Sequence, residues 1–85
     1  PTHITGLQST VVNQYLTALL WSSTNQVVKA TIYDRAGKLI SQQQSHLLPG
    51  NNNLRIPVAL LATGLYYVEI MTADGVRKTL RWLKE

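Results

Sequence analysis

The sequence predicts an all-β domain, built as a sandwich or barrel of antiparallel strands. Short runs rich in Val, Ile, Thr, Tyr and Leu recur between Gly, Asn and Pro clusters at a spacing of about ten residues. Two segments, Asp34–Lys38 and Ala73–Gly75, have the composition of hairpin turns. The one stretch with helical character, Val58–Ala62, lies between Pro57 and Gly64 and is too short to form more than a turn.

The Gly, Asn and Pro clusters divide the sequence into seven expected strands. In the third, Val28, Ala30 and Ile32 share one face because side chains alternate along a strand, and that face belongs to the core. The other face, with Lys29, Thr31 and Tyr33, is expected to be more exposed to solvent. The expected strands are His3–Leu7, Tyr15–Ser22, Gln26–Asp34, Lys38–Gln44, Asn52–Ile56, Leu65–Thr72 and Val76–Leu83.

The two hairpin turns have a chemical explanation. The Asp34 side chain can cap a type I turn, and Gly37 supplies the left-handed residue before the chain returns at Lys38, which makes a hairpin with a glycine bulge. Gly75 does the same in the second turn, so Leu65–Thr72 and Val76–Leu83 should pair antiparallel.

The segment Leu61–Tyr66 has the spacing of a tyrosine corner. In this motif a Tyr near the start of a strand donates its hydroxyl to the backbone of the preceding arch between two sheets. We therefore expect Tyr66 to be buried, together with Val68 and Ile70 on the same face of a central strand.

Length and composition indicate a single domain over residues 1–85, with residues 1–12 as either a linker or a first strand. The chain has no cysteine, so neither disulfides nor thiolate metal sites support the fold. The net charge of +4 is concentrated near the end, where Arg77, Lys78, Arg81 and Lys84 supply half of the eight Lys and Arg residues. The aromatic residues mostly alternate with apolar residues in strand-like runs, which argues against a nucleic-acid partner. No apolar run is long enough for membrane insertion.

No catalytic, metal or cofactor site is predicted. His3 and His46 are the only histidines, and the four carboxylates, Asp34, Glu69, Asp74 and Glu85, do not cluster at ligand spacing. Asp34 and Asp74 already have roles in turns, and no nucleophile elbow or phosphate-binding loop is present. We therefore expect a domain that is not an enzyme.

The aromatic residues leave an alternative function open. An exposed row with two or more of Trp21, Tyr15, Tyr33 and Tyr67 would favour an accessory module that binds carbohydrate or protein on a secreted enzyme or adhesin. The competing interpretation is that the rings serve as core and cross-strand pairs, since the chain has no Phe.

Three motifs resemble the C-terminal sorting domain, type A, of proteins exported by the type IX secretion system of Bacteroidota. The most specific is Leu61, Gly64, Tyr66, Val68 and Ile70, which is similar to the pattern L-x-x-G-x-Y-x-V-x-I of that family. The hairpin Asp34-x-x-Gly37-Lys38 and the ending Arg81–Lys84 complete the resemblance, which covers roughly the last sixty residues. The sequence departs from the family at Val11–Gln14, where a Tyr-Pro-Asn-Pro-like opening is usual, and by Glu85 after Lys84.

The resemblance implies a non-catalytic, immunoglobulin-like sandwich of about seven strands that directs an attached N-terminal cargo domain through the type IX translocon. It implies passage through the periplasm, recognition by an outer-membrane shuttle protein, and a secreted or cell-surface destination. In many members a sortase-like peptidase removes the domain. No cofactor is implied.

The closing strand is our candidate for the surface that the translocon recognises. We expect its free edge to offer backbone groups for β-augmentation, and we expect the terminal residues to be separable from the fold. The opposing interpretation is a solvated edge whose charges deter aggregation. The candidate recognition residues are Arg77, Lys78, Arg81, Trp82, Leu83, Lys84 and Glu85.

Overall fold

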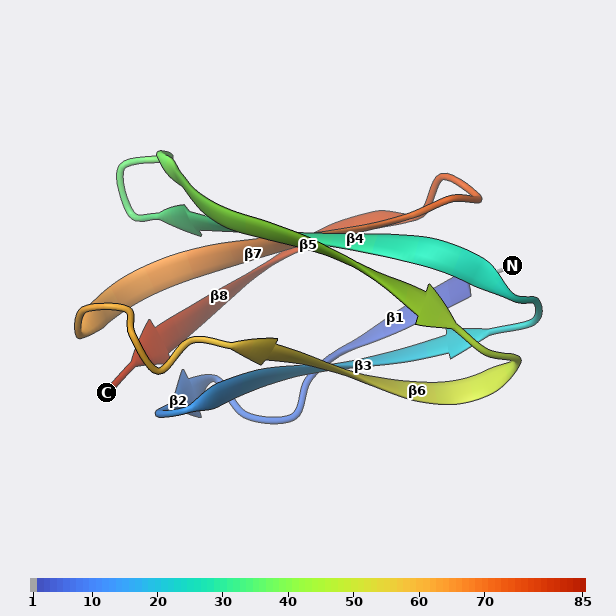
Figure 1. The fold of residues 1–85 in the computed structure, drawn as a ribbon, viewed down its shortest axis with the longest axis horizontal. Helices are drawn as coiled ribbons and strands as arrows, with labels where there is room; N and C mark the ends of the chain where they lie inside the picture. Colours follow the sequence, from blue (N-terminus) through green and yellow to red (C-terminus); the bar gives the residue numbers. More distant parts are fainter. Residues whose placement is uncertain (1) are drawn as a thin grey trace.

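The computed structural model describes residues 2–85, which form eight strands in two sheets and no helix. Figure 1 shows the sheets as two layers that cross at a shallow angle. The strands are β1 (Thr2–Leu7), β2 (Val11–Val12), β3 (Tyr15–Ser22), β4 (Gln26–Asp34), β5 (Leu39–Leu47), β6 (Gly50–Pro57), β7 (Gly64–Thr72) and β8 (Arg77–Lys84).

One sheet has the order β1-β3-β6 and the other the order β2-β8-β7-β4-β5. All neighbours are antiparallel except β2 and β8, which run parallel. The chain begins in the smaller sheet as β1 and crosses to the larger one as β2. This arrangement confirms the predicted all-β, immunoglobulin-like sandwich, and the described part of residues 1–12 contributes two strands to it.

The core lies between the inner faces of the two sheets, as the two-residue period of the strands requires. In β7 the residues Tyr66, Val68 and Ile70 are buried, and β7 is flanked by β8 and β4. The Tyr66 ring stacks on Trp82 of β8 with centroids 5.0 Å apart. This packing fixes the closing strand to the middle of the larger sheet.

Both predicted hairpin turns are present. The backbone N–H groups of Ala36 and Lys38 each donate to Asp34 Oδ1 over 2.9 Å. Gly37 has a φ of 87° and Gly75 one of 94°, in the left-handed region that favours glycine. A register shift follows, between Ile32 and Tyr33 in the pairing of β4 with β5, as expected for a bulge.

The tyrosine corner is confirmed. The Tyr66 hydroxyl donates to the carbonyl oxygen of Ala62 over 2.7 Å, and Leu61 packs against the core. The arch between β6 and β7 is thereby tied to the strand that follows it.

Three details differ from the sequence-based expectation. The structure adds β2, where two valines pair with the end of β8. The polar end of β5 stays in the sheet as far as Leu47 because its backbone pairs with β4. Thr31 is buried on the face expected to be wetter, since Gln42 Nε2 reaches over it and donates to its hydroxyl over 3.1 Å.

Candidate functional site

The candidate recognition residues on β8 fall on both faces of the strand. Trp82 pairs with Tyr66 and faces the core with 1% of its surface exposed, and Lys84 is 6% exposed. Arg81 and Leu83 face outward and are exposed. The Arg81 and Leu83 side chains are therefore accessible to a partner, whereas the Trp82 and Lys84 side chains are covered.

The two buried residues have few polar partners. The Lys84 ammonium donates to the carbonyl oxygen of Glu85 over 2.9 Å. The indole Nε1 of Trp82 is buried and has no hydrogen-bond partner within residues 2–85. Burying an unpaired N–H carries a desolvation cost, so Trp82 contributes to the fold through its ring rather than through its donor.

The free edge of β8 is shorter than the sequence predicted. The very end of the strand is covered, because Leu83 N donates to Thr10 O over 2.7 Å and Glu85 N donates to Val12 O over 2.9 Å. Backbone groups of alternate residues point the same way, so those of Thr79 and Arg81 also point away from β7. β2 pairs only with Leu83 and Lys84, which leaves Thr79 and Arg81 without a strand on that side within residues 2–85.

A hollow of about 430 Å³ lies beside this edge. Thr10 and Val11 form one side, Leu65 of β7 another, and Arg81, Trp82 and Leu83 of β8 the rest. Val11 was not predicted to lie in a strand, because a pair of valines has no alternation to mark it as one. Its apolar character directly before polar Asn13 and Gln14 was the available signal.

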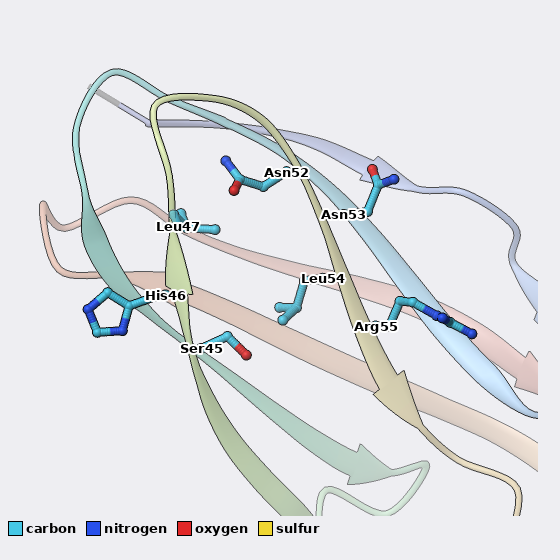
Figure 2. Close-up of a pocket in the computed structure, with 7 residues that line it drawn as sticks. All are labelled: Ser45, His46, Leu47, Asn52, Asn53, Leu54 and Arg55. Carbon is cyan, nitrogen blue, oxygen red and sulfur yellow. The ribbon is translucent and has the colours of Figure 1, made fainter.

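A second hollow, of about 360 Å³, lies at the seam where β5 and β6 approach each other (Figure 2). Leu47 and Leu54 point into the gap between the two strands, whereas His46 points away from it. This seam is bridged, since Gln43 Nε2 donates to Arg55 O over 3.3 Å and the Asn52 side chain bonds both backbone groups of Leu48. It is therefore less open to an added strand than the edge of β8.

The exposed aromatics occur on the smaller sheet. Tyr15 is 46% exposed and Trp21 is 40% exposed, and both lie on the outer face of β3. They meet the condition set above for an accessory binding module. The Tyr15 ring is covered on one side, however, by the Arg55 guanidinium, whose central carbon lies 4.2 Å from the ring centroid.

The Asp74 carboxylate links a turn to the first strand. Asp74 accepts hydrogen bonds from Thr72 and, over 2.8 Å, from Thr2. These bonds, the Thr72 one first, lower the pKa of Asp74 from its ordinary value of 3.8 to about 2. Asp74 thus joins the start of β1 to the turn between β7 and β8.

Two other features, a metal site and a membrane-spanning helix, are absent from the part of the chain that the structure describes. No group of three His, Asp or Glu residues is arranged to hold a metal ion among residues 2–85. No helix among these residues has the length and hydropathy needed to cross a membrane.

A family model described as "Secretion system C-terminal sorting domain" matches residues 11–84. The chain belongs to this family. Its function is that of a type IX secretion sorting signal, the destination is the cell surface or the medium, and the family is non-catalytic. The family match favours this function over the accessory module despite the exposed Tyr15 and Trp21. No curated protein sequence matches the sorting domain.

Solved structures show the same fold in other settings. A mutant β-glucosidase from Listeria innocua with laminaribiose has a TM-score of 0.59 and 11% identity over 100% of this chain and 16% of its own. An alkylpurine DNA glycosylase from Pseudomonas fluorescens, bound to DNA with an abasic site analogue, has a TM-score of 0.54 and 17% identity over 99% of this chain and 30% of its own. The sorting domain thus spans less than a third of each of these proteins. At such identities the likeness establishes the fold alone.

Proposed function

We propose that the type IX machinery recognises this sorting domain at the outward side of β8, through the edge at Thr79 and Arg81 and the exposed side chains beside it. The observation that carries the proposal is the gap in pairing: β2 covers Leu83 and Lys84 only, while the backbone groups of Thr79 and Arg81 point outward. An added strand at this edge would gain backbone hydrogen bonds, and Arg77 and Arg81 would add charge-dependent orientation.

In this proposal the buried members of the candidate set act through the fold. Trp82 and Lys84 hold the end of β8 in place, and the exposed Glu85 extends the pairing with β2 through its backbone. Lys78 is exposed and shares the face of β8 that carries Trp82. Arg77, Arg81 and Leu83 are the side chains that a partner would touch.

We further propose the route that the family resemblance implies. A cargo joined ahead of Thr2 reaches the periplasm by the general secretory pathway, and an outer-membrane shuttle protein then binds the sorting domain. A sortase-like peptidase removes the domain at the surface. The domain itself acts as a ligand of this machinery and carries out no chemistry.

The test is a fusion of the 85 residues to the C-terminus of a periplasmic reporter, in a type IX-competent bacterium and in a strain that lacks the translocon. We expect the reporter at the surface or in the medium of the competent strain only. Thr79→Pro removes a backbone donor on the outward side, which an edge strand tolerates, and should reduce export.

Charge is tested by Arg81→Glu, with Arg55→Glu on the opposite sheet as the matched control for the same change of charge. Export should fall for the first variant and not for the second. Equal export by Thr79→Pro, Arg81→Glu and the unmodified domain, all folded by circular dichroism, would remove β8 from the recognition surface.

A further inference from the structure

The outer face of the larger sheet is divided along its length. Towards the turn between β7 and β8, cross-strand rows are polar: Thr79, Glu69, Thr31 and Gln42 form one such row. Paired residues share a face of the sheet, so a row can be read directly from the register. A polar outer face is expected for an antiparallel sheet with one side in water.

At the other end the rows become apolar. Val11, Leu83 and Leu65 form one row across β2, β8 and β7, and Tyr67, Tyr33 and Leu39 continue the next row from Arg81 across β7, β4 and β5. We call the set Val11, Leu83, Leu65, Tyr67, Tyr33 and Leu39 the apolar strip.

The strip is accessible. Val11 is 45% exposed, Leu39 is 53% exposed and Leu83 is 40% exposed, although all three belong to strands. Leu65, Tyr67 and Tyr33 are half-buried between them. Contiguous apolar surface of this kind is typical of a protein contact site, whereas single exposed apolar residues are ordinary.

Arg81 is the cation within the strip. It heads the row of Tyr67, Tyr33 and Leu39 and lines the hollow of about 430 Å³ beside Val11 and Leu65. Among residues 2–85 its side chain makes no hydrogen bond to another group, so its donors are available. An arginine in an apolar surround pairs well with a carboxylate, because its planar group binds two oxygens at once.

The strip lies at the end of the sandwich away from Thr2. Thr2 pairs with Ser22 at one end of the sandwich, while β2 and the end of β8 lie at the other end (Figure 1). The molecule is 35 Å long in this direction. A cargo joined ahead of Thr2 is therefore attached at the end of the sandwich opposite the strip.

We propose that the apolar strip with Arg81 is the surface by which the export partner tells this domain from other sandwiches, and that the partner meets it with an apolar surface carrying a carboxylate opposite Arg81. This inference rests on the proposed function and deepens it. The strand edge of β8 supplies backbone pairing that many edges could offer, whereas the strip supplies side chains specific to this domain.

The experiment uses the reporter fusion with Leu39→Asp and Leu83→Asp as strip variants. Leu48→Asp is the matched control, because Leu48 is 62% exposed, compared with 53% for Leu39, but lies in the turn between β5 and β6 at the opposite end. Each strip variant should lower export about tenfold or more, as expected for a residue central to an interface, and the control should export normally. Thermal unfolding of the isolated domains verifies that all remain folded.

The outcomes separate the two proposals. Failure of the unmodified fusion to be exported overturns the proposed function. Normal export by both strip variants, with the unmodified fusion exported, overturns the strip alone. A second copy of the domain is the competing occupant: if sedimentation shows a dimer that Leu39→Asp and Leu83→Asp dissociate without loss of export, the strip is a self-contact and the inference is wrong.

Discussion

Tyr66 serves both the arch and the core, which makes it the residue where the tyrosine corner can be tested. Its hydroxyl bonds Ala62 O over 2.7 Å while its ring stacks on Trp82. We expect Tyr66→Phe to keep the stack and leave the Ala62 carbonyl unpaired, at a cost of about 1 kcal/mol. Urea unfolding measures the loss, and an unchanged unfolding midpoint would show that the hydroxyl bond does not stabilise the fold.

Asp74 predicts how stability depends on pH. Its pKa is lowered from 3.8 to about 2 by the hydroxyls of Thr72 and Thr2, so the folded state favours the carboxylate. The stabilisation is present at pH values above the ordinary pKa, and it is lost as the pH falls through the pKa that Asp74 has in the folded state. We expect the unfolding midpoint to decline between pH 4 and pH 2.

The matched variant for this prediction is Asp74→Asn, which should unfold more easily at neutral pH and show a smaller decline in acid. Comparison with the unmodified domain isolates Asp74, since the two proteins differ at this position alone. Parallel pH profiles for the two proteins would contradict the assignment.

At the scale of elements, the strands that the sequence predicted well are those that alternate. The bounds of β3 and β4 were predicted as they occur, because their apolar residues recur every second position and turns flank both strands. β2 was missed because two residues show no period. The polar end of β5 was cut short because its pairing with β4 depends on backbone groups that composition does not report.

The candidate site was predicted only in part, for a related reason. The seven candidate residues were chosen because they lie close together in the sequence. In a strand, however, neighbouring residues point to opposite faces, so the set is divided between the two faces. The alternation of Leu80, Trp82 and Lys84 with Arg81 and Leu83 was present in the sequence. The apolar strip was not readable in this way, because it gathers residues from five strands whose register the sequence does not specify.

The end of β8 also corrects the expectation that terminal residues are separable from the fold. Deleting residues 81–85 removes Trp82, which is 1% exposed, together with both partners of β2. Loss of a buried Trp costs about 3–5 kcal/mol, against a total of about 4–13 kcal/mol for a domain of this length. We expect the truncated domain to be largely unfolded by circular dichroism.

Trp82→Phe is the informative companion. It keeps an aromatic ring against Tyr66 and removes the indole N–H that has no partner within residues 2–85. The loss of unfolding free energy should stay below about 1.5 kcal/mol. The smaller ring loses packing contacts, and removal of the unpaired N–H partly offsets that loss. A truncated domain that melts like the intact one, or a Trp82→Phe domain that unfolds, would contradict this account of β8.

At the scale of the whole molecule, the two ends of the sandwich differ in the elements they hold. Thr2, the turn between β3 and β4, and the turn between β7 and β8 lie together, since Thr2 pairs with Ser22 and bonds Asp74. The opposite end holds β2, the end of β8 and the turn between β4 and β5. Attachment of cargo at one end and recognition at the other would let a single small domain be bound while it carries a much larger protein.

The difference between the two ends can be tested by inserting a tag at each. A short peptide tag flanked by Gly and Ser, inserted after Thr24, lengthens an exposed turn at the cargo end, and the same tag after Ala36 lengthens the turn next to Leu39. Exposed turns tolerate such insertions. We expect reporter export to continue with the tag after Thr24 and to be blocked with the tag after Ala36, because only the second tag shields the apolar strip. Each inserted domain should first show the circular dichroism spectrum of the unmodified one. Export that is blocked by the tag after Thr24 and unaffected by the tag after Ala36 would reverse the assignment of the two ends.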